Sequence, residues 1–174
     1  MTRRQTQQRE GFWASRRGAT AVEFALIALP LITLIFASLQ VAVIFFFDQA
    51  LQTATQKAAR QLLTGSVQDA GLSQKQFENI VCGNLPTQFN CNNLMVDVES
   101  SSSFAAANTA PLVPANNPNN NWSYSPGNAG DIVIMRVMYD WPVLGGPLAV
   151  GLANQPDGGH LMVATAVFKN EPFQ

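Results

Sequence analysis

An uninterrupted apolar stretch constrains the fold of this chain more than any other feature. From Phe24 to Phe47 the sequence runs for 24 residues without a charged side chain. As an α-helix, this stretch would be about 36 Å long, which is enough to cross the hydrocarbon core of a bilayer. The sequence therefore predicts a transmembrane helix at about residues 24–47.

The charged residues are distributed unevenly on the two sides of this stretch. Residues 1–18 carry a net charge of +4, and residues 48–174 carry a net charge of −4. Short flanks rich in arginine and lysine stay on the cytoplasmic side of a membrane. Arg16 and Arg17 directly precede the stretch, so we expect the N-terminus in the cytoplasm and the rest of the chain outside. In this interpretation the basic tail is a topology signal, and no nucleic-acid partner is expected.

Two residues in or beside the stretch are unusual for a simple membrane anchor. Glu23 places a carboxylate at the N-terminal end of the stretch, where burial in lipid is costly. A partner for this acid or a functional role is therefore expected. Pro30 removes one backbone donor and is expected to kink or loosen the helix. An ordinary kink and a functional hinge are both compatible with Pro30. Cleavage behind the stretch is not indicated, because bulky residues end it.

The helix is not expected to end where the apolar stretch ends. Small and apolar residues recur at steps of three and four residues up to Leu62, and Gly65 supplies a stop signal. We therefore expect one helix over residues 20–64, whose first half lies in lipid and whose second half offers a narrow apolar stripe to a small domain. The stripe consists of Leu51, Ala54, Thr55, Ala58, Ala59 and Leu62.

The remaining sequence predicts a small α+β domain over residues 65–174. Ser73 and Gln76 have the spacing of a capping box, which predicts a short helix from Gln74 to about Cys82. Alternating patterns predict a three-stranded antiparallel sheet with strands at residues 94–99, 131–141 and 161–170, of which the second is central. Such a small sheet is marginal alone, so packing on the apolar stripe is a folding requirement.

Residues 100–130 predict a long exposed loop between the first two strands. The segment is rich in asparagine and proline, and it contains no charged residue. Loops of this length are either mobile insertions or contact surfaces. If the loop contacts a partner, Trp122 and Tyr124 are the natural anchors.

The two cysteines predict a disulfide, and the sequence offers little else for covalent or metal chemistry. Cys82 and Cys91 both fall on the predicted outer side, where an oxidising compartment favours their pairing. With one histidine, His160, and no CxxC motif, no metal site is expected. No catalytic cluster or nucleotide-binding motif is present, so neither an enzyme nor a bound cofactor is expected.

The N-terminal junction resembles a known processing site. Gly18 is followed by ATAVEF, which places Glu23 fifth after the glycine with an apolar run behind it. This arrangement resembles the processing site of type IV pilin-like proteins. The stretch RRGATAVEFALIALPLITLIF and the closing ATAVFKNEPF resemble more closely the TadE-like proteins, TadE and TadF, of bacterial tight-adherence (Flp) pilus assembly.

This resemblance implies a pseudopilin or minor pilin that spans the bacterial inner membrane once, with a cytoplasmic N-terminus and a periplasmic C-terminal domain. A prepilin peptidase would remove the leader, residues 1–18, and leave Ala19 as the new N-terminus. Glu23 could then neutralise the amine of a neighbouring chain when the helices bundle.

The implied partners are the peptidase, other pilins or pseudopilins (including a TadE and TadF heteromer), the inner-membrane assembly platform and the lipid bilayer. Whether the protein enters the pilus, caps it or stays in the membrane is open. The alternative function is an uncleaved single-pass scaffold or receptor whose outer domain binds a ligand.

Overall fold

A computed structural model describes residues 16–108, 110, 112, 122–143, 151–156 and 158–173. The chain divides into two compact units between Gln40 and Val41. Helix α1 (Arg16–Leu63) contributes its first part to one unit and its second part to the other. The α+β class predicted from the sequence is confirmed, since a long apolar helix precedes a three-stranded sheet and short helices.

The long helix follows from the sequence pattern with small differences at its ends. It contains 48 residues, which corresponds to about 72 Å. Gly65 follows its last turn with a φ of +79°, a left-handed conformation that glycine adopts without strain. A Cβ at Gly65 would also overlap the ring of Phe173. Glycine is therefore required at position 65 for two reasons, the left-handed backbone conformation that ends the helix and the close approach of Phe173.

Two short helices follow α1 and lie beside it. Helix α2 (Ser66–Asp69) was not predicted, and helix α3 (Gln74–Gly83) was. The capping box is present in full, because the Ser73 side chain accepts from Gln76 N–H and the Gln76 side chain accepts from Ser73 N–H. A 3₁₀ turn, η2 (Cys91–Asn93), then leads into the sheet.

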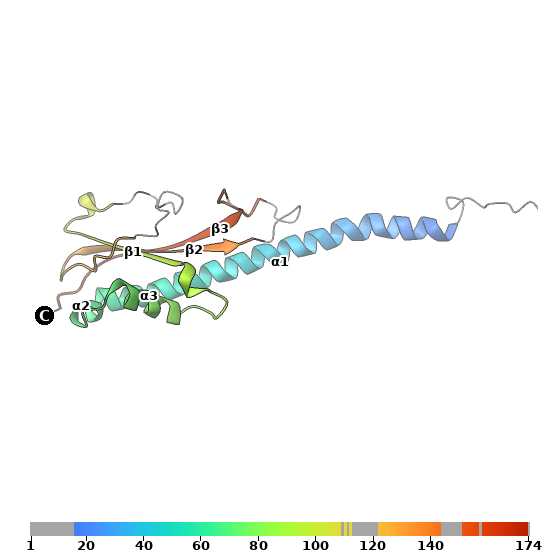
Figure 1. Ribbon diagram of the computed structural model, residues 1–174. Coiled ribbons are helices and arrows are strands. Elements are labelled where there is room, and N and C mark those ends of the chain that lie inside the picture. The colour runs from blue at the N-terminus through green and yellow to red at the C-terminus, as the bar shows by residue number, and fades with distance from the viewer. Residues whose placement is uncertain are drawn as a thin grey trace, which may run out of the picture. The chain divides into compact units, whose positions relative to one another are not determined.

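The sheet has the predicted topology. Strands β1 (Leu94–Ser101), β2 (Ile132–Pro142) and β3 (Gly159–Lys169) are antiparallel neighbours in the order β1-β2-β3, so β2 is central. A second 3₁₀ turn, η3 (Phe104–Ala106), follows β1. Figure 1 shows the second part of α1, which belongs to the same unit as the sheet, running along one face of the sheet, with α3 on the same side.

The inner face of the sheet packs on α1 and forms the main core. All six residues of the apolar stripe predicted on α1 are buried. Alternate residues of each strand join this core as the pattern predicts, but β1 and β2 are buried on both faces over most of their length, so the first strand is not half-buried as its pattern indicates. Inward-facing residues of the three strands complete this core: Leu94, Val96, Val98, Val133, Met135, Val137, Tyr139, Met162 and Ala164. The small residues of the stripe allow the helix to approach the sheet closely.

The outer face of the sheet carries a second, smaller cluster. Met95, Trp122 and Met138 are buried there, with Leu112 and Leu161 packed against them. The segment that contains Trp122 therefore covers part of this face. Residues 109, 111 and 113–121 of the predicted 100–130 loop lie outside the described residues.

Candidate functional surfaces

The predicted processing junction lies in the first turns of α1. The Gly18–Ala19 bond falls within the helix, and Gly18 and Glu23 are exposed. The backbone of Arg16, Arg17 and Ala19 is helical, and their side chains are outside the described part of the structure. Within that part, no ion pair involves Glu23.

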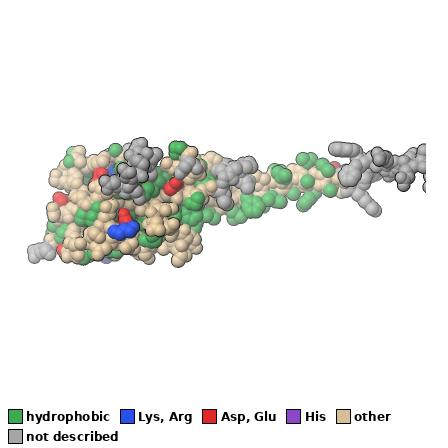
Figure 2. Space-filling view, in the orientation of Figure 1, with side chains coloured by type: hydrophobic (Ala, Val, Ile, Leu, Met, Phe, Trp, Pro, Cys, Tyr) green, Lys and Arg blue, Asp and Glu red, His purple; other side chains and the backbone are tan. Residues whose placement is uncertain are grey.

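The first part of α1 exposes apolar side chains around its whole circumference. Phe24, Leu26, Ile27 and Leu29 are each at least 70% exposed. From Thr20 onward, α1 is long and apolar enough to cross a membrane, and only 6% of its apolar window is buried. The core helix of a soluble protein would instead bury this surface. Figure 2 shows the hydrophobic side chains that cover this part of α1. These properties fit a membrane location for the helix.

The helix continues through Pro30. The hydroxyls of Thr33 and Ser38, which are near enough in sequence to compensate for a lost backbone bond, donate instead to the carbonyls of Leu29 (2.7 Å) and Leu34 (2.8 Å). Both are ordinary bonds to the residue four positions earlier. The role of Pro30 as a kink stays a prediction.

The transition from apolar helix to domain begins before the apolar stretch ends. Ile44 and Phe47 are buried in the domain, whereas Phe45 and Phe46 are exposed. The ring of Phe47 stacks on Trp141 with centroids 4.1 Å apart, and it contacts Phe89 edge-on at 5.5 Å. Phe47 therefore belongs to the domain core although its sequence context is that of a membrane segment.

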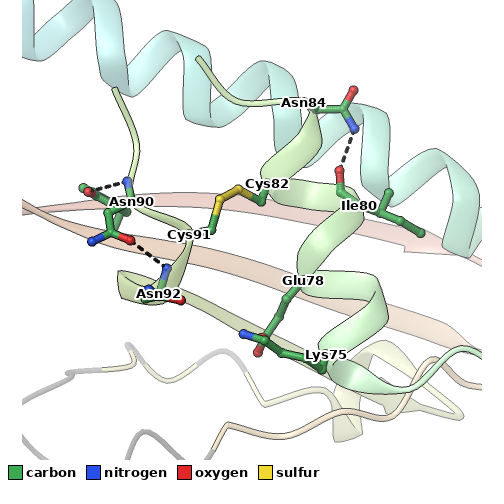
Figure 3. Close-up of a disulfide and its surroundings, with 9 residues drawn as sticks. Lys75, Glu78, Ile80, Cys82, Asn84, Asn90, Cys91 and Asn92 are labelled. Carbon is green, nitrogen blue, oxygen red and sulfur yellow. Dashed lines mark hydrogen bonds and ion pairs between the residues drawn. A yellow bond between two sulfur atoms is a disulfide. The ribbon is translucent and has the colours of Figure 1, made fainter. Parts of the chain in front are cut away.

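The predicted disulfide is present. Cys82 at the end of α3 is bonded to Cys91 of η2, with Cα atoms 5.8 Å apart. Figure 3 shows how this bond closes the loop that connects α3 to β1. Hydrogen bonds at both ends order the loop, because Asn84 Nδ2 donates to the Ile80 carbonyl (2.9 Å) and Asn92 N–H donates to Asn90 Oδ1 (3.1 Å).

The structure places Trp122 and Tyr124, the candidate contact residues of the loop, against the domain itself. Trp122 is 7% exposed and packs in the outer cluster. The Tyr124 hydroxyl donates to the Leu72 carbonyl (3.0 Å), and burial raises the pKa of this phenol above its ordinary value. Both residues would have to leave these contacts before they could anchor an external partner.

The same segment joins the edge of the sheet. Val98 N–H donates to the Ser123 carbonyl, and Ser125 N–H donates to the Val98 carbonyl, both at 2.8 Å. Residues 123–125 thus pair in parallel with the outer edge of β1. This contact covers an edge that would otherwise expose backbone donors and acceptors.

An ion pair that the sequence analysis did not identify lies beneath this segment. Asp97 on β1 and Arg136 on β2 are register partners, and Arg136 Nη1 donates to Asp97 Oδ2 at 3.2 Å. Arg136 Nη2 also donates to the Asn108 carbonyl, and Ser123 N–H donates to Asp97 Oδ1 at 3.0 Å. The sequence did contain a signal that could have identified this pair: an acid and a base stand at outward positions in the middle of two apolar strands.

The described residues contain no group of three or more His, Cys, Asp or Glu side chains that could hold a metal ion. His160 is half-buried, and its Nδ1 atom lies 2.5 Å from the Leu152 carbonyl, which is a structural contact. The surfaces with functional potential are therefore the apolar part of α1 and the faces of the domain.

Comparison with known proteins adds one match. Residues 18–60 match the model of the TadE-like protein family. The match begins at the glycine of the junction and covers most of α1, so it confirms the resemblance based on this part of the sequence. The closing strand, which also contributed to that resemblance, lies outside the match. No curated protein and no solved structure matches the chain.

Proposed function

We propose that this protein is a pseudopilin or minor pilin of the tight-adherence (Flp) pilus system, in which it takes part in pilus biogenesis. The observation that carries the proposal is the coincidence of three features at one place. The match to the TadE-like family starts at Gly18, the sequence there is GATAVEF, and an apolar helix with exposed side chains follows directly.

The proposed membrane topology follows from the charges that flank α1. The basic residues before the apolar stretch stay in the cytoplasm, and the disulfide-bonded domain lies in the periplasm, where oxidation is permitted. Because Phe47 packs in the domain, the membrane-spanning segment ends near Val43 on this side. Thr20–Val43 would then measure about 36 Å, which still suffices to cross the bilayer.

Cleavage by a prepilin peptidase behind Gly18 creates the charged amine that assembly uses. The Gly18–Ala19 bond lies in the first turns of α1, where helices fray and a peptide bond becomes accessible. Cleavage creates a charged amine at Ala19, one helical turn before Glu23. In an apolar bundle, the Glu23 carboxylate of one chain and the amine of a neighbour neutralise each other, whereas either group alone would be costly to bury.

Intact mass spectrometry of the native protein tests this function directly. The protein is purified from cells with and without the prepilin peptidase. We expect a mature chain that starts at Ala19 in the first strain and a chain heavier by residues 1–18 in the second. Recovery of the full-length chain from the strain that has the peptidase, while that strain makes pili, would refute the proposal and favour an uncleaved scaffold or receptor.

The role of Glu23 is tested separately with two variants. Glu23→Gln removes the charge and keeps the size, and Glu23→Asp keeps the charge. We expect Glu23→Gln to insert into the membrane normally but to be lost from assembled pilus complexes, with partial recovery in Glu23→Asp. Equal incorporation of Glu23→Gln and the wild type would exclude the charge-pairing role.

A further inference from the structure

We propose that one end of the domain lies in the headgroup layer of the membrane, where it makes a second contact with lipid beside α1. This end, the apolar end, consists of Phe46 of α1, residues 141–143 at the end of β2, and Leu152 and Ala153 before β3. Its partner is the lipid of the bilayer that α1 enters. The contact requires α1 to lie in a membrane, as proposed above, but it does not require cleavage behind Gly18.

The sheet runs back toward the point at which α1 enters the domain. Glu171, just after β3, donates its N–H to the carbonyl of Leu63 at the far end of α1 (2.9 Å). At the other end of the sheet, the ring of Trp141 stacks on Phe47, with centroids 4.1 Å apart. The end of β2 therefore lies beside the first turns of α1 that belong to the domain (Figure 1).

Two segments remote in sequence change from apolar to acidic at this level. In α1, Phe47 ends the apolar stretch and Asp48 follows it on the domain side. In β2, Asp140 is the last charged residue on the domain side and Trp141 follows it. Because Phe47 and Trp141 are in contact, the two changes occur side by side. A boundary shared in this way is expected where the plane between lipid and water cuts both segments.

The start of β3 brings further uncharged residues to the same level. His160 is the register partner of Trp141. The Leu152 carbonyl lies 2.5 Å from His160 Nδ1, and Asn154 N–H donates to the Gly159 carbonyl at 3.1 Å. The residues just before β3 are therefore held against the end of the sheet that Trp141 occupies.

The apolar end is uncharged and partly exposed. Residues 141–156 contain no charged side chain, and Asp157, which ends this run, lies outside the described residues. Phe46 is 63% exposed, and Pro142 and Ala153 are exposed as well. An apolar surface of this kind at one end of a domain marks an interaction site more often than a surface that faces water.

This surface is continuous with the apolar surface of α1, which identifies lipid as its partner. Val43 and Phe45, which precede and adjoin Phe46 on the helix, are 45% and 69% exposed. Lipid that surrounds these side chains is also the nearest apolar phase to Trp141, whose ring contacts Phe47. No additional protein is needed to cover the apolar end.

The height of the apolar end above the hydrocarbon core matches the headgroup layer. With the spanning segment ending near Val43, Phe47 is four residues or about 6 Å farther along the helix. The headgroup layer is about 5–7 Å thick on each side of the core. A tilt of the helix only reduces the height of Phe47. Because the residues used here all belong to the unit Val41–Gln174, no angle between this unit and the first part of α1 is required.

The charged and titratable neighbours fit the headgroup layer rather than the hydrocarbon core. Asp48 and Asp140 stand on the domain side of the stacked rings, and His160 is level with Trp141. Such groups are costly to bury in the core and are tolerated among headgroups and water. Tryptophan is itself enriched in this layer, because its ring is apolar and its N–H is polar.

Spin-label accessibility of the full-length protein tests the contact. Ala153→Cys is labelled in phosphatidylcholine nanodiscs that hold one copy each, and Lys75→Cys on α3 is the control. The native cysteines are bonded to each other, so the label attaches to the introduced one. Apolar oxygen concentrates in lipid and a polar nickel complex in water. We expect a higher ratio of oxygen to nickel collisions at position 153 than at position 75.

Two results of this measurement would overturn the proposal. Equal ratios at positions 153 and 75 would place the apolar end in water. Protection of position 153 from both reagents would mean that protein covers it, and the single copy in each disc excludes a second chain as the cause in the expected result.

Quenching by headgroup-labelled lipid tests Trp141 itself. Phosphatidylcholine with a nitroxide on its headgroup is added to nanodiscs of the wild type and of Trp141→Phe, which keeps an aromatic ring against Phe47. We expect a larger quenched fraction of the tryptophan emission in the wild type. An equal or smaller fraction in the wild type would contradict the contact. Neither readout depends on the N-terminal residue, so failure of processing behind Gly18 would be recognised separately.

Discussion

Arg136 on β2 and Asp97 on β1 lie directly opposite each other and form a buried ion pair, with Nη1 and Oδ2 3.2 Å apart and side chains 6% and 3% exposed. The pair also holds the loop on the outer face of the sheet. Asp97 accepts from Ser123 N–H, and Arg136 donates to the Asn108 carbonyl. The ion pair therefore connects strand register to loop position.

Arg136→Met should destabilise the domain strongly. The substitution leaves the Asp97 carboxylate buried without its cation, which costs about 3–5 kcal/mol in the free energy of unfolding. Chemical unfolding of the full-length protein in detergent, followed by tryptophan fluorescence, measures this loss. Lys75→Met at an exposed position is the control, with an expected change within about 0.5 kcal/mol. An equally small change for Arg136→Met would mean that the pair does not stabilise the fold.

The stability of the domain should depend on pH through Asp97. Burial raises the pKa of Asp97 above its ordinary value of 3.8, and Glu99 acts in the same direction, while the Ser123 N–H and Arg136 oppose this shift. Between pH 3.8 and the raised pKa, the folded protein binds more protons at this site than the unfolded protein. This contribution to stability is therefore present below pH 3.8 and is lost as the pH rises through the folded pKa.

The comparison of wild type with Asp97→Asn isolates this contribution, because asparagine does not titrate. As the pH rises from 3.5 to about 6, the wild type should lose stability relative to the variant. The free energy of unfolding of both proteins, measured across this range, gives the difference. A difference that does not change with pH, or that changes in the opposite direction, would show that the pKa of Asp97 is not raised.

Loss of the Cys82–Cys91 bond should weaken the domain by about 2–3 kcal/mol, because the reduced loop gains conformational entropy in the unfolded state. Cys91 is exposed, so a thiol reductant can reach the bond. Thermal unfolding with and without reductant measures the effect. The variant with both cysteines replaced by serine should match the reduced wild type and should not respond to reductant. A response of this variant would mean that the reductant acts elsewhere.

Phe47→Ala should destabilise the domain, whereas Phe45→Ala should not. Phe47 is 8% exposed and stacks on Trp141, and Phe45 is 69% exposed. Truncation of a buried phenylalanine costs about 3–5 kcal/mol, and an exposed one costs about 0.5 kcal/mol or less. Thermal unfolding in detergent, detected by the near-ultraviolet signal of the aromatic cluster, distinguishes the two. Equal effects would indicate that Phe47 lies in the apolar phase rather than in the domain core.

Local patterns in the sequence were sufficient for the secondary structure and the topology of the sheet. The alternation in residues 94–99, 131–141 and 161–170 predicted each strand and which of its residues share a face, and the stripe from Leu51 to Leu62 predicted the face of α1 that packs on the sheet. The Ser73 capping box and the Gly65 stop were equally local signals. Each depends on residues a few positions apart, whose periodicity determines which side chains share a face.

The tertiary structure decided features that depend on residues far apart in the sequence. Asp97 and Arg136 are 39 positions apart, so only strand register makes them partners. Trp122 is buried because its segment returns to the outer face of the sheet, and Phe47 is buried because Trp141 meets it from β2. The sequence by itself determined the helix, the strands and their apolar faces, since hydrophobic periodicity is a local property. Register and loop position were decided by long-range packing, which a local pattern does not encode.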